Sequence, residues 1–179
     1  MGADRLHILT GAPGSGKTAI LDGLGDGVHT VREPAREVIA EQRAIGGTGT
    51  SEQDPAMFVA LLLERSIAKY RDAARSAAAL VLFDRGVPDC VAYAAVLDVD
   101  PTGCLAAARQ YRYHPQVMIV EPWEEIYATD AERTMSFEQT IPFHAALVDA
   151  YEGAGYSLVA VPTGSVAERV AFVGDAITR

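Results

Sequence analysis

Short apolar runs alternate with longer stretches of helical periodicity along this chain. Five of the runs lack the in–out alternation of a sheet that faces water, which is typical of strands covered by helices on both faces. These runs are 6–9, 28–32, 80–83, 117–120 and 158–161. Each gap contains helical sequence, so the pattern predicts right-handed crossovers and an α/β fold, with a five-stranded parallel sheet between two layers of helices.

The ends of two predicted helices are marked by their residue types. Asp54 is a favourable N-cap and Pro55 a favourable first helical residue, so a helix is predicted from 55 to about 75. Gly153 and Gly155 are typical of residues that end a helix, here near Tyr151.

The segment 129–142 is polar and less regular than the sequence around it. Pro142 has no backbone N–H to donate, so it is unfavourable in a helix interior. Such a segment is typical of a short lid that closes over a bound nucleotide. An ordinary surface connection would have the same composition.

Composition and charge narrow the classes of partner. The 179 residues are 49% hydrophobic and 22% charged, which is typical of one globular domain spanning 1–179. The net charge of −9 argues against nucleic acid or an anionic membrane as a partner. No apolar run approaches the roughly 20 residues of a membrane span, and no signal-peptide pattern precedes the first strand. Cys90 and Cys104 have neither metal-ligand nor disulfide-framework spacing, so we expect a cytoplasmic protein with reduced thiols; its oligomeric state stays open.

Residues 11–18 match the phosphate-binding pattern G-x-x-x-x-G-K-[ST] without a gap. They are Gly11, Ala12, Pro13, Gly14, Ser15, Gly16, Lys17 and Thr18, and Ala19 follows in the predicted helix. Glycines let the backbone approach phosphates closely, and the helix that follows directs its positive dipole end at them. We expect Lys17 to contact the β- and γ-phosphates of ATP and the Thr18 hydroxyl to bind Mg²⁺. GTP is the alternative nucleotide, disfavoured because the chain has no N-K-x-D motif to read guanine.

The apolar run 80–83 ends in a carboxylate, Asp84. Because the carboxyl ends of parallel strands meet at one edge of a sheet, we expect Asp84 to lie near Thr18 and to hold Mg²⁺, directly or through a water molecule. The alternative is an aspartate that only caps the turn after its strand.

Further segments resemble the nucleoside and nucleotide kinases of the P-loop superfamily. Arg32-Glu33-Pro34 is similar to the R-E-P of thymidylate kinases, and Asp84-Arg85-Gly86 is similar to the D-R or E-R pair that ends the third strand of those enzymes. A closer overall match is a small family of AAA-type P-loop domains related to the ribosylnicotinamide kinase domain. That match rests on Glu33-x-x-Arg36, on Phe83-Asp84-Arg85-Gly86 followed by Asp89, on Asp130-x-x-Arg133 and on Val161-Pro162.

The resemblance implies catalytic roles for Lys17, Glu33, Asp84, Arg85 and Arg133. Glu33 would orient the attacking hydroxyl and accept its proton, Arg85 would face the transferring phosphoryl group or a substrate anion, and Arg133 would reach from the lid. Simpler interpretations stay open for three residues. Glu33 would place negative charge at a helix N-terminus, Arg36 would be its surface ion-pair partner, and Arg133 would pair with Asp130 along a helix.

The helix predicted over 55–75 is expected to form a wall of the acceptor site. Arg65 falls on its apolar stripe with Phe58, Leu61 and Leu62, so Arg65 either binds the acceptor or extends past this surface to solvent. The candidates for substrate binding are Arg36, Gln53, Arg65, Asp89 and Tyr93.

We therefore predict an ATP- and Mg²⁺-dependent phosphotransferase that acts on a hydroxyl group of a small molecule, such as a nucleoside-like metabolite or an antibiotic. The single arginine of the lid, Arg133, favours a neutral acceptor over a phosphate-bearing one. The alternative is a regulatory switch that hydrolyses ATP slowly and signals to a protein partner. A deep second cavity lined by Glu33, Arg36, Arg65 and Asp89 would favour the kinase, and a flat surface there the switch.

Overall fold

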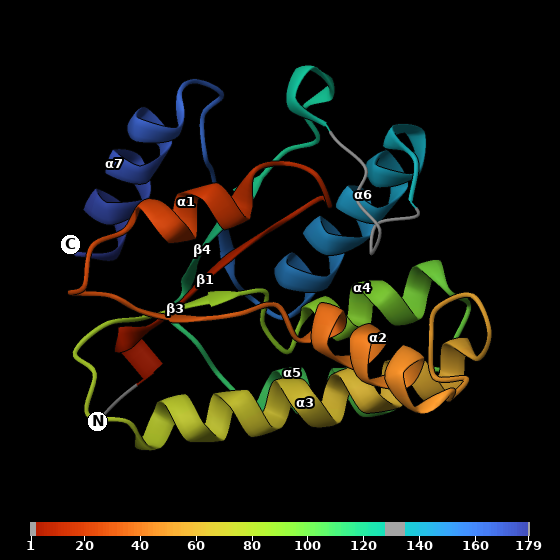
Figure 1. Ribbon diagram of the computed structural model, residues 1–179. Coiled ribbons are helices and arrows are strands. Elements are labelled where there is room, and N and C mark those ends of the chain that lie inside the picture. Colours follow the sequence, from red (N-terminus) through yellow and green to blue (C-terminus); the bar gives the residue numbers. More distant parts are fainter. Residues whose placement is uncertain (1–2, 128–134, 179) are drawn as a thin grey trace.

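The computed structural model describes residues 3–127 and 135–178 (Figure 1). Its centre is a five-stranded sheet in the order β2-β3-β1-β4-β5, with every pair of neighbouring strands parallel. The strands are β1 (Leu6–Gly11), β2 (His29–Val31), β3 (Val81–Asp84), β4 (Gln116–Val120) and β5 (Ser157–Ala160). The predicted parallel sheet is confirmed, and the predicted strand positions agree with it to within two residues.

Seven α-helices and two short 3₁₀ helices surround the sheet in the described part of the chain. They are η1 (Ala3–Arg5), α1 (Lys17–Gly23), α2 (Pro34–Ile45), α3 (Pro55–Arg75), α4 (Asp89–Val96), α5 (Thr102–Gln110), η2 (Glu124–Ile126), α6 (Phe137–Gly153) and α7 (Val166–Ile177). None of the helices in these residues is long and apolar enough to cross a membrane.

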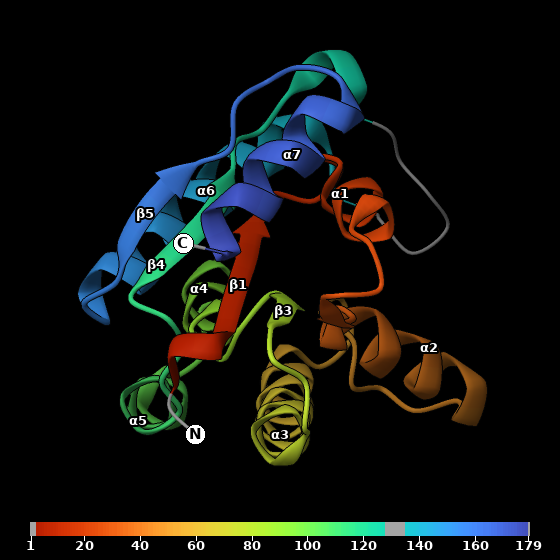
Figure 2. The same cartoon turned by 90° about the vertical axis from the view of Figure 1, so that its left-hand side faces the viewer.

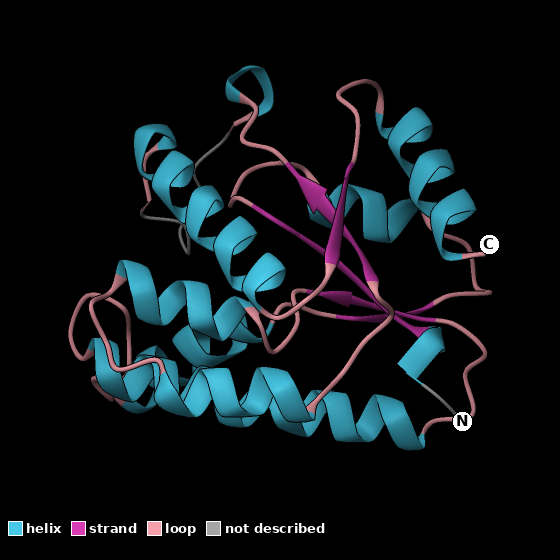
Figure 3. Cartoon of the chain, turned by 180° about the vertical axis from the view of Figure 1, so that it is seen from behind, coloured by secondary structure: helices cyan, strands magenta, loops and turns pink. Residues whose placement is uncertain are grey.

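Both faces of the sheet are buried under helices. Helices α1 and α7 pack together on one face, where Ile20 and Val173 join a core with Leu9 of β1 (Figure 2). The other face carries α3 to α6, and Phe143 and Tyr151 of α6 pack there against the strands (Figure 3). Successive strands thus present their carboxyl ends at one edge, between the two helical layers.

The caps of α3 and α6 explain where these helices begin. The Asp54 carboxylate accepts a hydrogen bond from the Met57 N–H at 2.9 Å, so α3 starts at Pro55 as predicted. Ser136 and Gln139 form a reciprocal capping box, and α6 starts directly after it at Phe137.

Pro142 corrects one expectation, because it lies inside α6 rather than in an irregular segment. Residues 137–142 of the predicted lid are therefore the first turns of this helix. Proline removes one helical hydrogen bond, but Phe143, Leu147 and Tyr151 of α6 are fully buried in the core. Tertiary packing of these side chains outweighs the local preference of one residue. Most of the remaining lid segment lies outside the described residues, so the lid stays a prediction.

Candidate functional site

Residues 11–18 form a loop between the end of β1 and the start of α1. Gly14 and Gly16 have positive φ angles of 77° and 83°, which side chains other than glycine rarely adopt. Gly11 has a φ of 136°, and a Cβ atom there would lie 2.2 Å from the Val120 carbonyl oxygen of β4. The glycines at these positions are therefore required by the backbone path of the loop.

Lys17 lies within the curve of this loop. Its ammonium group donates hydrogen bonds to the carbonyl oxygens of Gly11 at 3.0 Å and Ala12 at 2.9 Å. Burial, with repulsion from Arg85, lowers the Lys17 pKa to about 8. The ammonium is thus a buried cation that an incoming phosphate anion would stabilise.

Asp84 ends β3 beside the loop, because Leu9 of β1 pairs with Asp84 in the sheet register. Its side chain is buried, and in the described part of the chain Oδ1 has no hydrogen-bond partner. Burial, with repulsion from Glu33, raises the pKa of Asp84 to about 6. An unpartnered carboxylate oxygen near phosphate-binding backbone fits a role in holding a divalent cation.

Thr18 is the second candidate Mg²⁺ ligand, and it is exposed to the cleft in front of the loop. The described residues contain no group of three or more His, Cys, Asp or Glu side chains that would hold a metal by themselves.

Glu33 lies just after β2, at the N-terminus of α2, and its side chain is 14% exposed. Its carboxylate accepts hydrogen bonds from Arg85 Nε at 2.8 Å and Arg36 Nε at 3.2 Å. Burial alone would raise the pKa of Glu33, but Arg85, Lys17 and Arg36 together lower it to about 2. Glu33 is therefore an anion at neutral pH that faces the phosphate-binding loop.

Arg85 is placed differently from the sequence prediction. Its side chain is 1% exposed, and its guanidinium donates to Glu33 and, at 2.9 Å, to Asp89 Oδ1. The Arg85 backbone has a φ of 72°, which is unusual for a residue with a side chain and turns this one beneath Glu33. Arg85 does not line the cleft but contacts Glu33, the carboxylate that does, and its role toward a substrate anion stays a prediction.

Asp89, which was expected to bind the acceptor, is buried, and its role toward an acceptor stays a prediction. It accepts hydrogen bonds from Thr10 Oγ1 at 2.7 Å, from the Gly86 N–H at 2.8 Å and from the Tyr151 hydroxyl. Together with its contact to Arg85, these bonds tie β1, β3 and α6 together behind the cleft.

The cleft in front of the loop is lined by the phosphate-binding residues, by Glu33 and Arg36 of the α2 start, and by side chains from α3 and α4. Its lining residues are Pro13, Gly14, Ser15, Gly16, Lys17, Thr18, Glu33, Ala35, Arg36, Ile39, Ser51, Glu52, Phe58, Tyr93 and Met135. Tyr93 and Arg36, two of the predicted substrate residues, are therefore at the site.

A second cavity of about 630 Å³ continues from this cleft, and the two share Ser51, Glu52, Tyr93 and Met135. Its other walls come from α4 and α6: Val96, Leu97, Gln139, Pro142 and Phe143. None of Glu33, Arg36, Arg65 and Asp89, the residues predicted to line a second cavity, lines this one; Glu33 and Arg36 line the adjoining cleft instead. Most residues that line the second cavity are apolar, and its polar groups include the Gln139 amide, the Ser51 hydroxyl and the Glu52 carboxylate.

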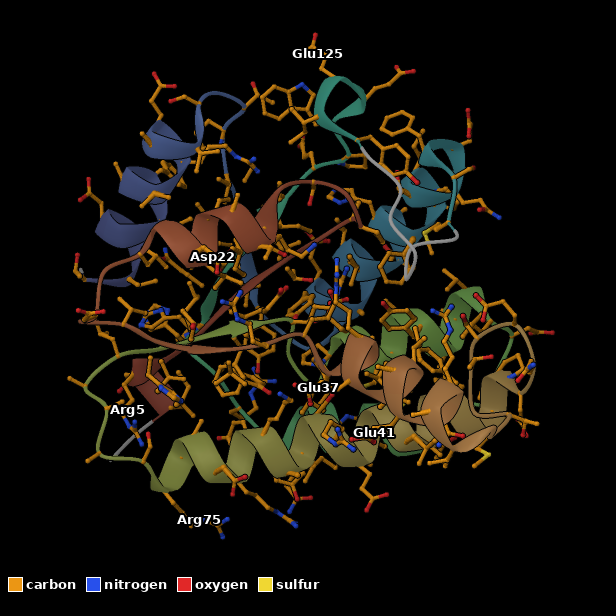
Figure 4. The ribbon with its side chains drawn as sticks, viewed as in Figure 1. Arg5, Asp22, Glu37, Glu41, Arg75 and Glu125 are labelled. Carbon is orange, nitrogen blue, oxygen red and sulfur yellow. The ribbon has the colours of Figure 1, made fainter. Side chains whose placement is uncertain are left out.

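Two predicted acceptor residues lie elsewhere. Arg65 forms ion pairs with Glu37 at 3.2 Å and Glu41 at 2.6 Å, so its charge is satisfied between α2 and α3. Figure 4 labels both glutamates on α2, above α3. Gln53 is exposed in the connection between α2 and α3 and lines neither the cleft nor the second cavity. The face of α3 that carries Arg65 packs against α2, and Arg65 lines neither the cleft nor the second cavity. Arg133 lies outside the described residues.

Sequence reasoning missed Arg169, a buried arginine of α7 that contacts the phosphate-binding loop from behind. A signal for it exists: Arg169, Val173 and Ile177 are four residues apart in turn, so Arg169 is a charge on the apolar face of its helix. Glu52 and the apolar walls contributed by α4 and α6 were missed as well, and no local pattern marks them.

Comparison with known proteins agrees with this geometry. Residues 6–169 match the family model described as AAA domain, and the chain belongs to this family. No curated protein matched the sequence. Among solved structures, the chain resembles the NadR protein in complex with NR, with 16% identity, a TM-score of 0.70 and 97% of the chain covered. The match covers 50% of the NadR protein, so the chain spans half of its length.

Two further solved structures are similar over almost their whole length. The shikimate kinase from Acinetobacter baumannii in complex with shikimate has 15% identity and a TM-score of 0.55, with 97% of this chain and 93% of the kinase covered. The thymidylate kinase from Ehrlichia chaffeensis has 16% identity and a TM-score of 0.57, with 96% and 98% covered. The fold is therefore that of a P-loop kinase.

Proposed function

We propose that this protein is an ATP- and Mg²⁺-dependent phosphotransferase that acts on a hydroxyl group of a small molecule. The observation that carries the proposal is Glu33, an ionised carboxylate that lines the cleft in front of the phosphate-binding loop, where a second, mostly apolar cavity adjoins that cleft. A nucleotide-dependent switch needs the loop but has no use for such a cavity.

ATP would bind with its triphosphate along residues 11–18. Lys17 would exchange the carbonyl oxygens of Gly11 and Ala12 for phosphate oxygens, which are stronger partners for a buried ammonium. Thr18 and Asp84 would hold Mg²⁺, which when bound screens the charge of the phosphates.

Glu33 would accept a hydrogen bond from the acceptor hydroxyl and orient its oxygen toward the γ-phosphorus. A bond forms between that oxygen and phosphorus while the bond to the bridging oxygen of ADP breaks, and the hydroxyl proton passes to Glu33 and then to solvent. A carboxylate with a pKa near 2 is a weak base, so its main contribution is orientation, which suits phosphoryl transfer.

The cavity favours an acceptor without phosphate groups. Among the described lining residues of both spaces the cationic side chains are Lys17, which belongs to the phosphate loop, and Arg36, which is paired with Glu33. Tyr93 presents an aromatic ring to both spaces, so a neutral ring compound that carries a hydroxyl, such as a nucleoside or a hydroxylated antibiotic, fits the lining. NadR and shikimate kinase, similar in fold, were solved with NR and with shikimate.

The test is a screen for ADP formation that depends on an added acceptor, with nucleosides, hydroxylated metabolites and antibiotics. Glu33→Gln should lower acceptor-dependent turnover at least about 100-fold while ATP affinity changes little. Lys17→Ala should abolish turnover through the loss of phosphate contacts. Wild-type-like transfer by Glu33→Gln would refute the role of Glu33. Slow ATP hydrolysis that no acceptor stimulates would favour the regulatory switch.

A further inference from the structure

Arg169 of α7 lies against the outer side of the phosphate-binding loop, away from the cleft. Its residue exposure is 2%, and Nη2 donates a hydrogen bond to the Ser15 carbonyl oxygen at 2.8 Å. Its guanidinium lies over the ring of Trp123, with 5.6 Å between the Cζ atom and the ring centroid. The arginine thus joins α7 and the segment after β4 to the loop.

The charge of Arg169 has no described counter-ion. None of the ion pairs in the described part of the chain includes it, and its Nε is buried there without a hydrogen-bond partner. Burying a cation without an anion costs free energy, and a ring face compensates for only part of that cost. The positive potential of this side chain is therefore directed at the loop without a carboxylate to neutralise it.

The bond from Arg169 to Ser15 also sets the direction of the next amide. The described chain contains no cis peptide bond, and in a trans peptide the C=O and the following N–H point in opposite directions. When Arg169 holds the Ser15 carbonyl outward, the Gly16 N–H must point inward, toward the phosphates. A Cβ atom on Gly16 would lie 2.7 Å from Arg169 Nη1, so a side chain at this position would displace the guanidinium.

We propose that Arg169 is a positioning residue of the phosphate-binding loop: it turns the Ser15–Gly16 peptide toward the triphosphate and adds buried positive charge behind it. The proposal rests on the nucleotide binding proposed above. It assigns Trp123 the supporting role of covering the guanidinium face. Neither residue contacts the acceptor cavity.

The test compares the affinity of the full chain for two ligands, ATP and inorganic tripolyphosphate, by titration calorimetry. Tripolyphosphate lacks the nucleoside and so reports on the loop alone. Arg169→Ala should lower the affinity for both ligands by roughly tenfold or more, because a hydrogen bond from a charged group and part of the positive potential at the phosphate site are lost. Arg169→Lys keeps the charge without the planar guanidinium and should be intermediate. Arg169→Met keeps the packing of the stem and replaces the alanine variant if that variant does not fold.

Arg112 provides a matched control. It too stacks on an aromatic ring, Tyr156 at 4.1 Å, and donates to backbone carbonyl oxygens, those of Ala108 and Ala154. Arg112 lies far from the loop in the fold, between α5 and β4. Arg112→Ala should lower the thermal midpoint while the affinities for ATP and tripolyphosphate stay unchanged.

Added guanidinium chloride at a low, non-denaturing concentration gives the sharpest readout, because the ion can fill the space left by Arg169→Ala. It should restore affinity in that variant, whereas the same concentration of sodium chloride should not. Unchanged affinity for both ligands in Arg169→Ala would overturn the proposal, and so would weaker binding of ATP alone. If the wild-type protein binds neither ligand, the proposed nucleotide binding is wrong and this role falls with it; if the wild type binds both, only the role of Arg169 is at stake.

Discussion

Arg85 Nε donates a hydrogen bond to Glu33 Oε1 at 2.8 Å, across the gap between β3 and the start of α2. The sequence separates the two residues by 52 positions, and the sheet order makes β2 and β3 neighbours. The buried guanidinium thereby keeps Glu33 ionised and fixes the direction of its carboxylate toward the phosphate-binding loop. In the proposed reaction Arg85 would therefore act through Glu33.

Arg85→Met should therefore have two effects. It leaves the buried carboxylates of Glu33 and Asp89 without their shared partner, which should lower the free energy of unfolding by about 3–5 kcal/mol. It should also reduce acceptor-dependent turnover more than ATP affinity, because the orientation of Glu33 is lost. Chemical denaturation measures the first effect and steady-state kinetics the second. Wild-type turnover in a folded Arg85→Met protein would show that Glu33 needs no partner.

Asp84 should produce an acidic limit to Mg²⁺ binding. Its folded-state pKa is raised to about 6, so the carboxylate is protonated below that pH and ionised above it. Mg²⁺ binds the ionised form, so the affinity for MgATP should fall as pH decreases through about 6 and level off above it. Glu33 stays ionised across this range because its pKa is lowered to about 2.

Two variants check that assignment in titrations of MgATP between pH 5 and 8. Asp84→Asn should bind MgATP more weakly, and its affinity should no longer fall as the pH decreases through about 6. Thr18→Ala should also bind MgATP more weakly but keep the fall in affinity at acidic pH, since Asp84 is still present. If the affinity of Asp84→Asn for MgATP still falls at acidic pH as in the wild type, another group is responsible for the pH dependence.

Gly11 and Gly46 separate a steric requirement from a purely conformational one. Both have positive φ, but a Cβ on Gly11 would meet the backbone of β4 at 2.2 Å, whereas a Cβ on Gly46 meets nothing within 4 Å. Gly46→Ala should cost about 1–2 kcal/mol of stability, the cost of the left-handed conformation alone. Gly11→Ala should cost clearly more and also lower the affinity for ATP, as thermal unfolding and calorimetry would show. Equal costs at the two positions would contradict the close contact between β1 and β4.

Arg65 tests whether the proposed acceptor site extends to the face of α3 that packs against α2. Its ion pairs with Glu37 and Glu41 are partly exposed, so Arg65→Met should change stability by less than about 1 kcal/mol. The KM for the acceptor should not change, in contrast to Tyr93→Ala, which removes a wall of both spaces. A raised acceptor KM in Arg65→Met would return Arg65 to the site.

The sequence alone determined the features that depend on residues close together along the chain. The phosphate-binding loop is contiguous, so its glycines, Lys17 and Thr18 are recognisable at once. Apolar runs without in–out alternation predicted the parallel sheet. The N-cap at Asp54 likewise involves residues within one turn of each other.

Only the tertiary structure decided which side chains meet across the sheet edge. Arg85 and Asp89 were found in the sequence, but whether they face the cleft or lie beneath Glu33 depends on the order of β2, β3 and β1. Arg65 and Arg169 are both charges on apolar helical faces, and periodicity cannot distinguish them. One face packs against the glutamates of α2 and the other against the carbonyl oxygen of Ser15, 154 residues away. The physical reason is that a helix pattern specifies which side is buried, whereas the partner on that side is set by long-range packing.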